Sequence, residues 1–352
     1  MDKKKQMAFN LNNFLLSMSA ILDFKEFDLE GTPLNHFKRV SYIALNLGVK
    51  FNFEPKMMAD LCSLALIYNL EKNELEKIPF LNTKEFLEDS LIKEIIDFSS
   101  KLDKMFKLSD NQIENRVKAI EFVKENKENF SNELINNFLE VSSQISFWLD
   151  LQYENEILMY IYGSLHDFTT VLDFEEILNL TTIFHKLENK NSIIIERASK
   201  VADEFNFEHK DKQIFLIATS LQNIGKMMIP NSILNKKEKL SSSEFEIIKS
   251  YPYHTKRVLG AIMGFADILS LATKVQERLD GSGYIYGLEA KSLSLKDRLL
   301  SCLIIYNALR EDRSYRNAFK HSEAIKIMKN EAEIGKIDKS IVEIFENIFV
   351  IK

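Results

Sequence analysis

Residues that break helices are scarce in this sequence, which has only 10 glycines and 5 prolines among its 352 residues. Glycine and proline build the turns on which all-β folds depend, and they interrupt long helices. Apolar residues recur at three- and four-residue spacing in stretches such as 57–67 and 134–149. Asn82, Asp173 and Ser241 each precede an acid by three positions, which is the pattern of a helix start. No alternating apolar pattern persists long enough to require a sheet, so we expect an all-α fold.

A short internal echo predicts two related helical units. The sequence FNFEPK at 51–56 returns as FNFEHK at 205–210, and in both copies an apolar stretch follows and ends near an asparagine. The separation is 154 residues throughout. The chain length also suits two domains of ordinary size. The expected units cover residues 1–165 and 166–352.

Composition excludes several classes of protein. The formal net charge of -6 argues against binding to nucleic-acid polymers or to anionic membranes. The two cysteines, Cys62 and Cys302, rule out a disulfide scaffold and suit a reducing cytoplasm. No run reaches the ~18 apolar residues of a membrane span, and the basic start lacks the cleavage site of a signal peptide. We expect a cytoplasmic protein.

Three segments of the second half carry specific motifs in a fixed order. Residues 221–234 read LQNIGKMMIPNSIL, residues 276–284 read QERLDGSGY, and residues 306–316 read YNALREDRSYR. These segments and their spacing resemble the HD-GYP family, a subgroup of the HD-domain phosphohydrolases, over about residues 190–345. The first half resembles a diverged HD-type unit that begins near His36. The resemblance implies two HD-type helical bundles in tandem.

The resemblance also implies a chemistry. Family members with an intact site hydrolyse cyclic di-GMP and hold two or three iron or manganese ions with His and Asp side chains. Two cations bridged by hydroxide create a nucleophile at neutral pH and clamp the phosphodiester oxygens. Imidazole and carboxylate suit iron and manganese as ligands. Each ligand comes from a different helix, so the whole set must be present together.

This sequence departs from the family pattern at nearly every ligand position, and none of its six histidines falls on such a position in the second unit. An early His is also missing from residues 190–197. The remaining carboxylates, Glu277 and Asp280, share one loop and cannot build a binuclear centre. We expect no metal centre, and no phosphodiesterase activity by the family mechanism. The replaced positions are Gln222 and Asn223 for a His-Asp pair, Tyr251 for a His before proline, Val275 and Gln276 for a His-His pair, and Ile304 for a late Asp.

Other positions agree with the family and are candidates for holding a nucleotide, because lysine and arginine bind phosphates. Each has a simpler interpretation. The Asp-Gly-Ser-Gly sequence is ordinary turn chemistry, a lysine can cap a helix end, and the two arginines can pair with neighbouring acids at the surface. The candidate ligand-binding residues are Lys226, Lys236, Asp280, Tyr284, Arg313 and Arg316.

The sequence therefore favours a catalytically inactive HD-GYP-type protein that acts in cytoplasmic signalling. It would bind a protein partner and, as a second hypothesis, cyclic di-GMP. The alternative is a metal-dependent cyclic di-GMP phosphodiesterase with a non-standard site. That site would combine the literal His166-Asp167 pair with Glu277 and with His36, which occupies the first-His position of the first unit and has no visible partner in the sequence.

Overall fold

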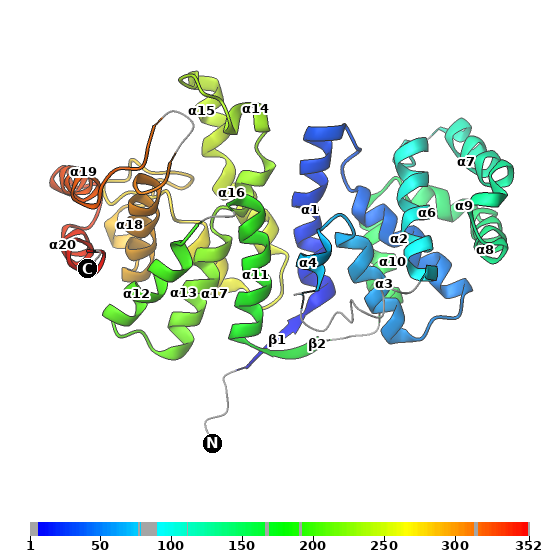
Figure 1. Ribbon diagram of the computed structural model, residues 1–352, viewed down its shortest axis with the longest axis horizontal. Coiled ribbons are helices and arrows are strands. Elements are labelled where there is room, and N and C mark those ends of the chain that lie inside the picture. The colour runs from blue at the N-terminus through cyan, green and yellow to red at the C-terminus, as the bar shows by residue number, and fades with distance from the viewer. Residues whose placement is uncertain are drawn as a thin grey trace. The chain divides into compact units, whose positions relative to one another are not determined.

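The chain folds into two compact helical units, as the computed structural model shows (Figure 1). The structure describes residues 6–76, 78, 90–110, 112–165, 169–189, 192–312 and 316–350. The N-terminal unit is Ala8–Thr170, and the C-terminal unit is Val171–Lys352 together with Met1–Met7. The all-α prediction is confirmed, apart from two short strands that pair as a two-stranded sheet: β1 (Gln6–Asn10) and β2 (Thr169–Asp173).

The N-terminal unit is built around α2, which packs against α1, α3, α6, α8 and α10. Its core is dense in aliphatic and aromatic side chains, among them the fully buried Phe14, Phe37 and Phe98. The elements are α1 (Leu11–Glu30), α2 (His36–Lys50), α3 (Pro55–Ile67), α4 (Lys72–Leu75), α6 (Ser90–Phe106), α7 (Ile113–Glu125), η1 (Lys127–Asn129), α8 (Asn132–Ser142), α9 (Ile145–Asp150) and α10 (Glu154–Ser164).

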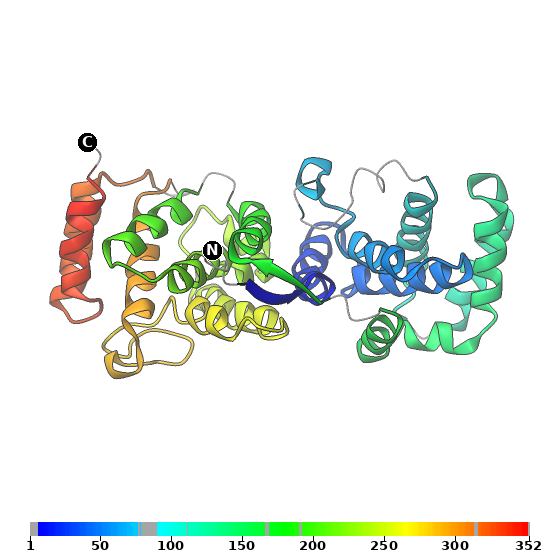
Figure 2. The same cartoon turned by 90° about the horizontal axis from the view of Figure 1, so that it is seen from below.

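The C-terminal unit is built around α13, which packs against α11, α12, α17 and α18. The C-terminal helices α19 and α20, red in Figure 2, lie side by side and contact α18. The elements are α11 (Phe174–Glu188), α12 (Ile194–Glu204), α13 (His209–Leu221), η2 (Ile224–Met228), α14 (Asn231–Leu234), α15 (Ser242–Lys249), α16 (Tyr251–Gly260), α17 (Ala266–Ala272), η3 (Ala290–Ser292), α18 (Leu295–Leu309), α19 (His321–Glu333) and α20 (Lys339–Ile348).

The sequence echo corresponds to the same backbone turn in both units. Asn52 and Asn206 both adopt the left-handed conformation, with φ of 55° and 50°. Asparagine tolerates that conformation better than most residues. In each turn the following phenylalanine amide reaches back five residues, from Phe53 to the Gly48 carbonyl (3.0 Å) and from Phe207 to the Ala202 carbonyl (2.9 Å). These matched turns support the predicted internal repeat.

Two of the three expected helix starts are present as capping boxes. Asp173 and Glu176 cap α11 reciprocally, and Ser241 and Glu244 do the same for α15. Asn82 lies outside the described residues. Among the described residues, no helix combines the length and the apolar character that crossing a bilayer requires.

Candidate functional site

The Gly-Lys motif of the second unit lies where η2 meets the start of α16. A Cβ atom on Gly225 would stand 2.1 Å from the Tyr251 carbonyl oxygen and 2.5 Å from the Thr255 nitrogen. The Gly225 amide donates to the Thr255 hydroxyl at 3.1 Å. Only glycine allows this approach. The ammonium of the next residue, Lys226, lies 5.1 Å from the centre of the Tyr251 ring.

Two of the residues at replaced ligand positions form a hydrogen bond with each other. The Gln276 amide donates to the Tyr251 hydroxyl at 2.8 Å. Tyr251 is fully buried, and burial raises the pKa of its hydroxyl above the usual range, so it is neutral at pH 7. Val275 and Ile304 are buried apolar side chains. Where the family pattern has metal ligands, these four positions therefore hold a hydrogen-bonded neutral pair, Tyr251 and Gln276, and two hydrocarbon side chains, Val275 and Ile304.

The surviving carboxylate, Glu277, is occupied by the backbone of the signature loop. It is almost completely buried, and its two oxygens accept hydrogen bonds from the Tyr286 and Leu288 amides, each at 2.8 Å. Elsewhere in the loop, the backbone at Gly283 packs so closely against residues 276–278 that an added Cβ would stand 2.4 Å from the Arg278 nitrogen. Glu277 thus fixes loop 280–288 and does not present its carboxylate to a metal.

A polar network lies further along the chain than Ile304, the replaced position of the late acidic ligand. Arg197 of α12 donates to the Asn307 side chain, and its guanidinium lies 5.4 Å from the Tyr306 ring centre. Asn307 in turn donates to Glu311 at 2.5 Å, and Asn189 donates to the same carboxylate at 3.3 Å. These contacts join the end of α11 to α12 and α18.

The residues of the second unit consequently do not suit the binuclear iron or manganese centre of the family. Among the described ranges, no three His, Cys, Asp or Glu side chains gather where they could hold a metal ion. Valine and isoleucine cannot ligate, and a neutral buried tyrosine is a poor ligand.

Of the candidate nucleotide contacts, Lys226 and Tyr284 lie near Tyr251. Tyr284 is held by its amide, which donates to the Gln276 carbonyl at 3.2 Å, and the Lys249 ammonium lies 6.0 Å from its ring centre. Burial raises the pKa of the Tyr284 hydroxyl. The pKa of Tyr251 is raised first by burial and then by the nearby Tyr284. Lys226 and Tyr284 thus both lie near Tyr251, and Lys249 lies near Tyr284.

The other candidates have local structural partners. Lys236 forms an ion pair with Glu244 at 2.7 Å, and Asp280 accepts from both the amide (3.0 Å) and the hydroxyl (2.6 Å) of Ser282. The Arg316 guanidinium donates to four carbonyls at the end of α18 and beyond, at 2.6 to 3.3 Å. Its partners are backbone oxygens, in contrast to the acids expected from the sequence. Arg313 lies outside the described residues.

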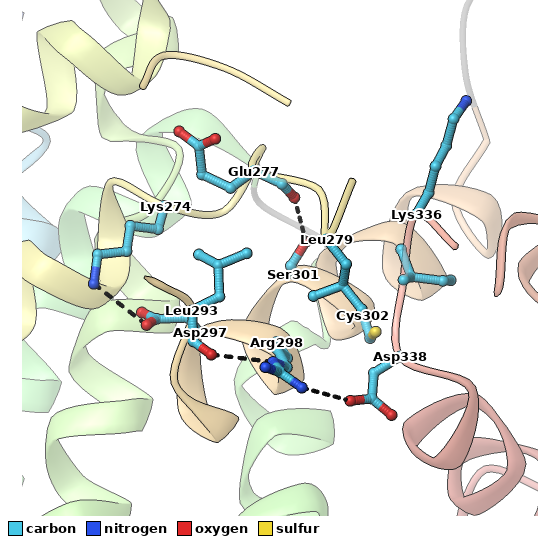
Figure 3. A pocket seen from close by; sticks show the side chains of 11 residues that line it. Lys274, Glu277, Leu279, Leu293, Asp297, Arg298, Ser301, Cys302, Lys336 and Asp338 are labelled. Carbon is cyan, nitrogen blue, oxygen red and sulfur yellow. Dashed lines mark hydrogen bonds and ion pairs between the residues drawn. The ribbon is translucent and has the colours of Figure 1, made fainter. Parts of the chain in front are cut away.

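A small cavity lies between residues 274–279, residue 293 and the first half of α18, and residues 336–338 (Figure 3). Its charged walls are paired: Lys274 with Asp297 (3.3 Å) and Arg298 with Asp338 (3.2 Å). The cavity volume of about 10 Å³ corresponds to roughly one water molecule. It is too small for a nucleotide.

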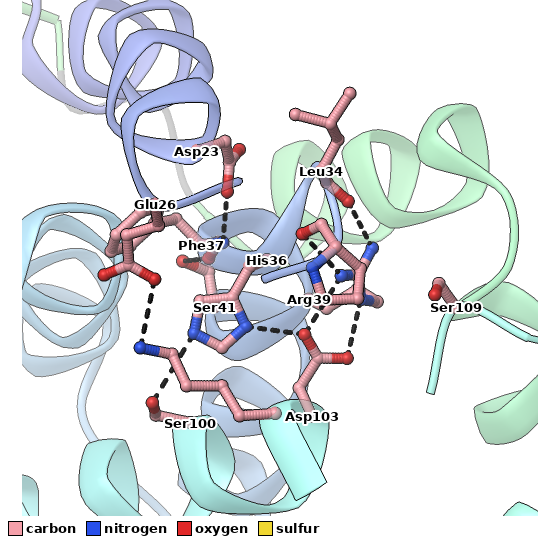
Figure 4. Close-up of polar contacts among 12 residues, drawn as sticks. Asp23, Glu26, Leu34, His36, Phe37, Arg39, Ser41, Ser100, Asp103 and Ser109 are labelled. Carbon is pink, nitrogen blue, oxygen red and sulfur yellow. Dashed lines mark hydrogen bonds and ion pairs between the residues drawn. The ribbon is translucent and has the colours of Figure 1, made fainter. Parts of the chain in front are cut away.

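In the N-terminal unit His36 has the partner that the sequence did not show. Its Nδ1 lies 2.6 Å from the Asp103 carboxylate (Figure 4). Its Nε2 lies 2.8 Å from the Tyr68 hydroxyl. Arg39 donates to both oxygens of Asp103, at 2.7 and 3.0 Å. Burial alone would raise the pKa of Asp103, but the Arg39 guanidinium and His36 hold it below its ordinary value. The cluster is buried and closed, so His36 is a structural residue here.

The rival site built on His166, Asp167, His36 and Glu277 gains no support. His166 and Asp167 lie outside the described residues. His36 is bonded to Asp103 and Tyr68, and Glu277 is bonded to two loop amides.

A further pair of contacts was not anticipated from the sequence. The Asn223 amide donates to Glu188 at 3.4 Å, and in the N-terminal unit the Asn69 amide donates to Glu26 at 3.3 Å. The asparagines belong to the sequence echo, but the glutamates lie on α11 and α1, before the echo begins. Beside Glu188 lies His185, whose pKa is lowered by burial, so its ring is neutral at pH 7.

Known proteins resemble this chain in sequence and in fold. The family model described as HD domain matches residues 174–341. A 3'3'-cGAMP-specific phosphodiesterase 1 of Vibrio cholerae is 24% identical over 61% of this chain and 52% of its own length. A cyclic di-GMP phosphodiesterase of Pseudomonas aeruginosa is 34% identical over 32% of this chain and 27% of its own. The chain thus spans about half, or less, of the length of these relatives.

A solved structure agrees with the fold of nearly the whole chain. The crystal structure of a cyclic GMP-AMP specific phosphodiesterase of Vibrio cholerae covers 97% of this chain, and the match takes in 98% of that protein. Its TM-score is 0.56 at 16% sequence identity, which supports the helical fold alone. The HD domain matched at residues 174–341 and the phosphodiesterase relatives support the resemblance of this chain to the HD-GYP family.

Proposed function

We propose that this protein binds a cyclic dinucleotide and does not hydrolyse it by the metal-dependent route of its family. The observation behind this proposal is the Tyr251–Gln276 hydrogen bond of 2.8 Å, in which two former ligand positions satisfy one another. Glycine packing at Gly225 and Gly283 maintains the surrounding framework although the ligands are replaced. The protein would therefore keep the shape of the family site without its reactive centre.

The binding half of the proposal depends on the cationic and aromatic side chains that remain. Lys226 lies over Tyr251, and Lys249 lies near Tyr284. Ammonium groups hold phosphates, and aromatic rings stack on nucleobases. Relatives named for cyclic di-GMP and 3'3'-cGAMP suggest the ligand class.

A second candidate function is a phosphodiesterase with a non-standard site. The names of the relatives favour it over an inactive protein, since each of those quoted is a phosphodiesterase. The metal-binding side chains that remain in this chain argue against it, because the Glu277 carboxylate accepts hydrogen bonds from two backbone amides. Hydrolysis of a cyclic dinucleotide by the purified chain would establish this second function.

A protein partner is part of the proposal, because a bound nucleotide that is not hydrolysed must be read by another molecule. The C-terminal unit exposes aromatic side chains of the kind found in interface centres, namely Phe245, Tyr253 and Tyr286. A cytoplasmic signalling role remains our prediction for the compartment and the setting.

Calorimetric titration tests the proposal. We expect heat of binding with cyclic di-GMP or 3'3'-cGAMP, and no hydrolysis product after long incubation with added manganese. Lys226→Ala should weaken binding by about tenfold or more, because a charged phosphate contact is lost. Lys200→Ala, at an exposed lysine of α12, is the matched control and should bind as the parent does. The absence of heat with either nucleotide at high micromolar concentration contradicts the proposal.

A further inference from the structure

The helices α14 and α15 of the C-terminal unit form an arm, residues 231–250, that buries none of its own helical residues. Figure 1 shows both helices at one end of that unit. Every residue of α14 and α15 is described, and none of them is buried. On α15 the apolar side chains of Phe245 and Ile247 are 49% and 41% exposed. Since helices gain most of their stability by packing an apolar face, we expect another surface to cover this arm.

The charges of the arm indicate the chemistry of that surface. Within the described part of the chain, the exposed residues Lys237, Glu238 and Lys239 form no ion pair, which leaves one lysine in excess. The helix α16, which contacts α15, adds the exposed Lys256 and Arg257. A basic surface around exposed apolar side chains suits a partner that is acidic and partly apolar. The other charges of the arm compensate one another, as Lys236 with Glu244 (2.7 Å) and Lys249 with Glu246 (2.8 Å).

The chain itself contains a surface of that kind, at the end of α1 in the N-terminal unit. Phe27 and Leu29 are 48% and 63% exposed, and the acids Asp28 and Glu30 alternate with them. The last turn of α1 contains no basic residue, although the C-terminus of a helix favours cations. Lys104 approaches Glu30 at 3.6 Å. Further cations, brought by another molecule, would be stabilised at this helix end.

The formal charges of the two units agree with such a pairing. Residues 8–170 contain 26 Asp and Glu against 16 Lys and Arg, a net charge of -10, whereas the rest of the chain contains 30 Lys and Arg against 26 Asp and Glu, a net charge of +4. Unlike parts of two copies therefore attract each other. An arm-to-arm contact would bring lysines together and is disfavoured for the same reason.

We infer that this protein self-associates through the arm of one copy and the end of α1 of a second copy. Phe245 of the arm would meet the apolar side chains of Phe27 and Leu29, with lysines and acids paired around them. This inference names the protein partner of the proposed function. Its test contains no nucleotide, so the failure of nucleotide binding and the failure of self-association are distinguishable.

Sedimentation velocity of the full chain, from low to high micromolar concentration, tests the inference. We expect a concentration-dependent dimer at low salt that dissociates as NaCl screens the charges. Lys237→Glu with Lys239→Glu should raise the dimer Kd about tenfold or more. Lys200→Glu with Lys210→Glu is the matched control, because it makes the same change of charge at two exposed lysines outside the arm and should dimerise as the parent does.

A charge exchange tests the other half of the contact. Glu30→Lys alone should also weaken the dimer about tenfold or more. An equal mixture of Glu30→Lys with the double arm variant should restore dimers, because the unaltered arm of one variant can meet the unaltered α1 end of the other. A monomer at every concentration in low salt overturns the inference and leaves a foreign protein or a lipid surface as the occupant of the arm. A dimer whose Kd is the same in the parent, the arm variant and the control overturns it as well.

Discussion

Gly225→Ala is the substitution that most directly tests how the site is assembled. The added methyl group would stand 2.1 Å from the Tyr251 carbonyl oxygen and 2.5 Å from the Thr255 nitrogen, well inside van der Waals contact. Both neighbours are backbone atoms, so neither can rotate away. Either η2 or α16 must move, and the Gly225–Thr255 hydrogen bond is weakened by that movement.

The expected magnitude follows from three contributions. Overpacking costs about 1–3 kcal/mol, and the upper end applies because the obstacle is backbone. The strained hydrogen bond adds about 1 kcal/mol. Alanine lowers the entropy of the unfolded chain, which offsets about 0.4–1 kcal/mol. The net loss of unfolding free energy is therefore about 2–4 kcal/mol, or a Tm lower by roughly 5–15 °C for a unit of this size.

Differential scanning calorimetry is the assay, because the two units can unfold in separate transitions. Gly163→Ala is the matched control: it lies in α10 of the other unit, and nothing stands within 4 Å of the added Cβ. This control should be neutral or should stabilise by up to about 1 kcal/mol. If Gly225→Ala is as stable as Gly163→Ala, the close approach of η2 and α16 is not the reason for glycine at this position.

Three further substitutions have defined outcomes in chemical denaturation. Asp103→Asn should lower the unfolding free energy by about 3–5 kcal/mol near pH 7, because it leaves the buried Arg39 charge without its partner. The pKa of Asp103 is lower in the folded protein than in the unfolded chain, so the stability difference from the parent should shrink as the pH falls below about 4. The pKa of Asp23 is shifted in the opposite direction, so the pH dependence of its contribution to stability is reversed. Burial raises its pKa to about 6 from 3.8, so the unfolding free energy of the parent should fall by up to about 3 kcal/mol as the pH rises from 4 to 6. Asp23→Asn keeps the acceptor for the Phe37 amide. It should remove that fall and be the more stable protein at pH 7. Glu277→Gln should cost about 2 kcal/mol and speed hydrogen exchange of the loop amides it now binds, measured by mass spectrometry; unchanged exchange there would remove its role as the loop anchor.

Local patterns in the sequence were sufficient for much of the fold. Scarce breakers and capping pairs indicated helices, and the asparagines of the echo, Asn52 and Asn206, adopt the same left-handed turn. These features depend on neighbours a few residues away, which a sequence displays directly. The strands β1 and β2 were not anticipated, because each has only five residues and their pairing joins distant parts of the chain.

The sequence was enough to predict which residues stand at the site, but it did not show which of them contact one another. The replaced ligands could be read from the motif spacing, but the bond between Tyr251 and Gln276 depends on how α16 and the signature loop meet. His36 lies 67 residues before Asp103, so no local pattern reveals their bond. Long-range pairs of this kind follow from packing of the whole unit.

The framework glycines explain how a signature loop can be retained without catalysis. Gly225 and Gly283 are required by backbone approaches of 2.1 and 2.4 Å for an added Cβ. Such requirements come from packing and are independent of any metal. Motif glycines therefore report the fold, whereas the side chains between them decide the chemistry.

The most direct test of the account is a metal analysis combined with an activity assay on one preparation. The full chain is purified without chelator, its iron and manganese are measured by mass spectrometry, and the same sample is incubated with cyclic di-GMP and 3'3'-cGAMP. A phosphodiesterase relative with an intact site, purified in parallel, is the positive control. The account predicts far less than one iron or manganese ion per chain and no linear dinucleotide product. Near-stoichiometric iron or manganese together with hydrolysis would contradict it.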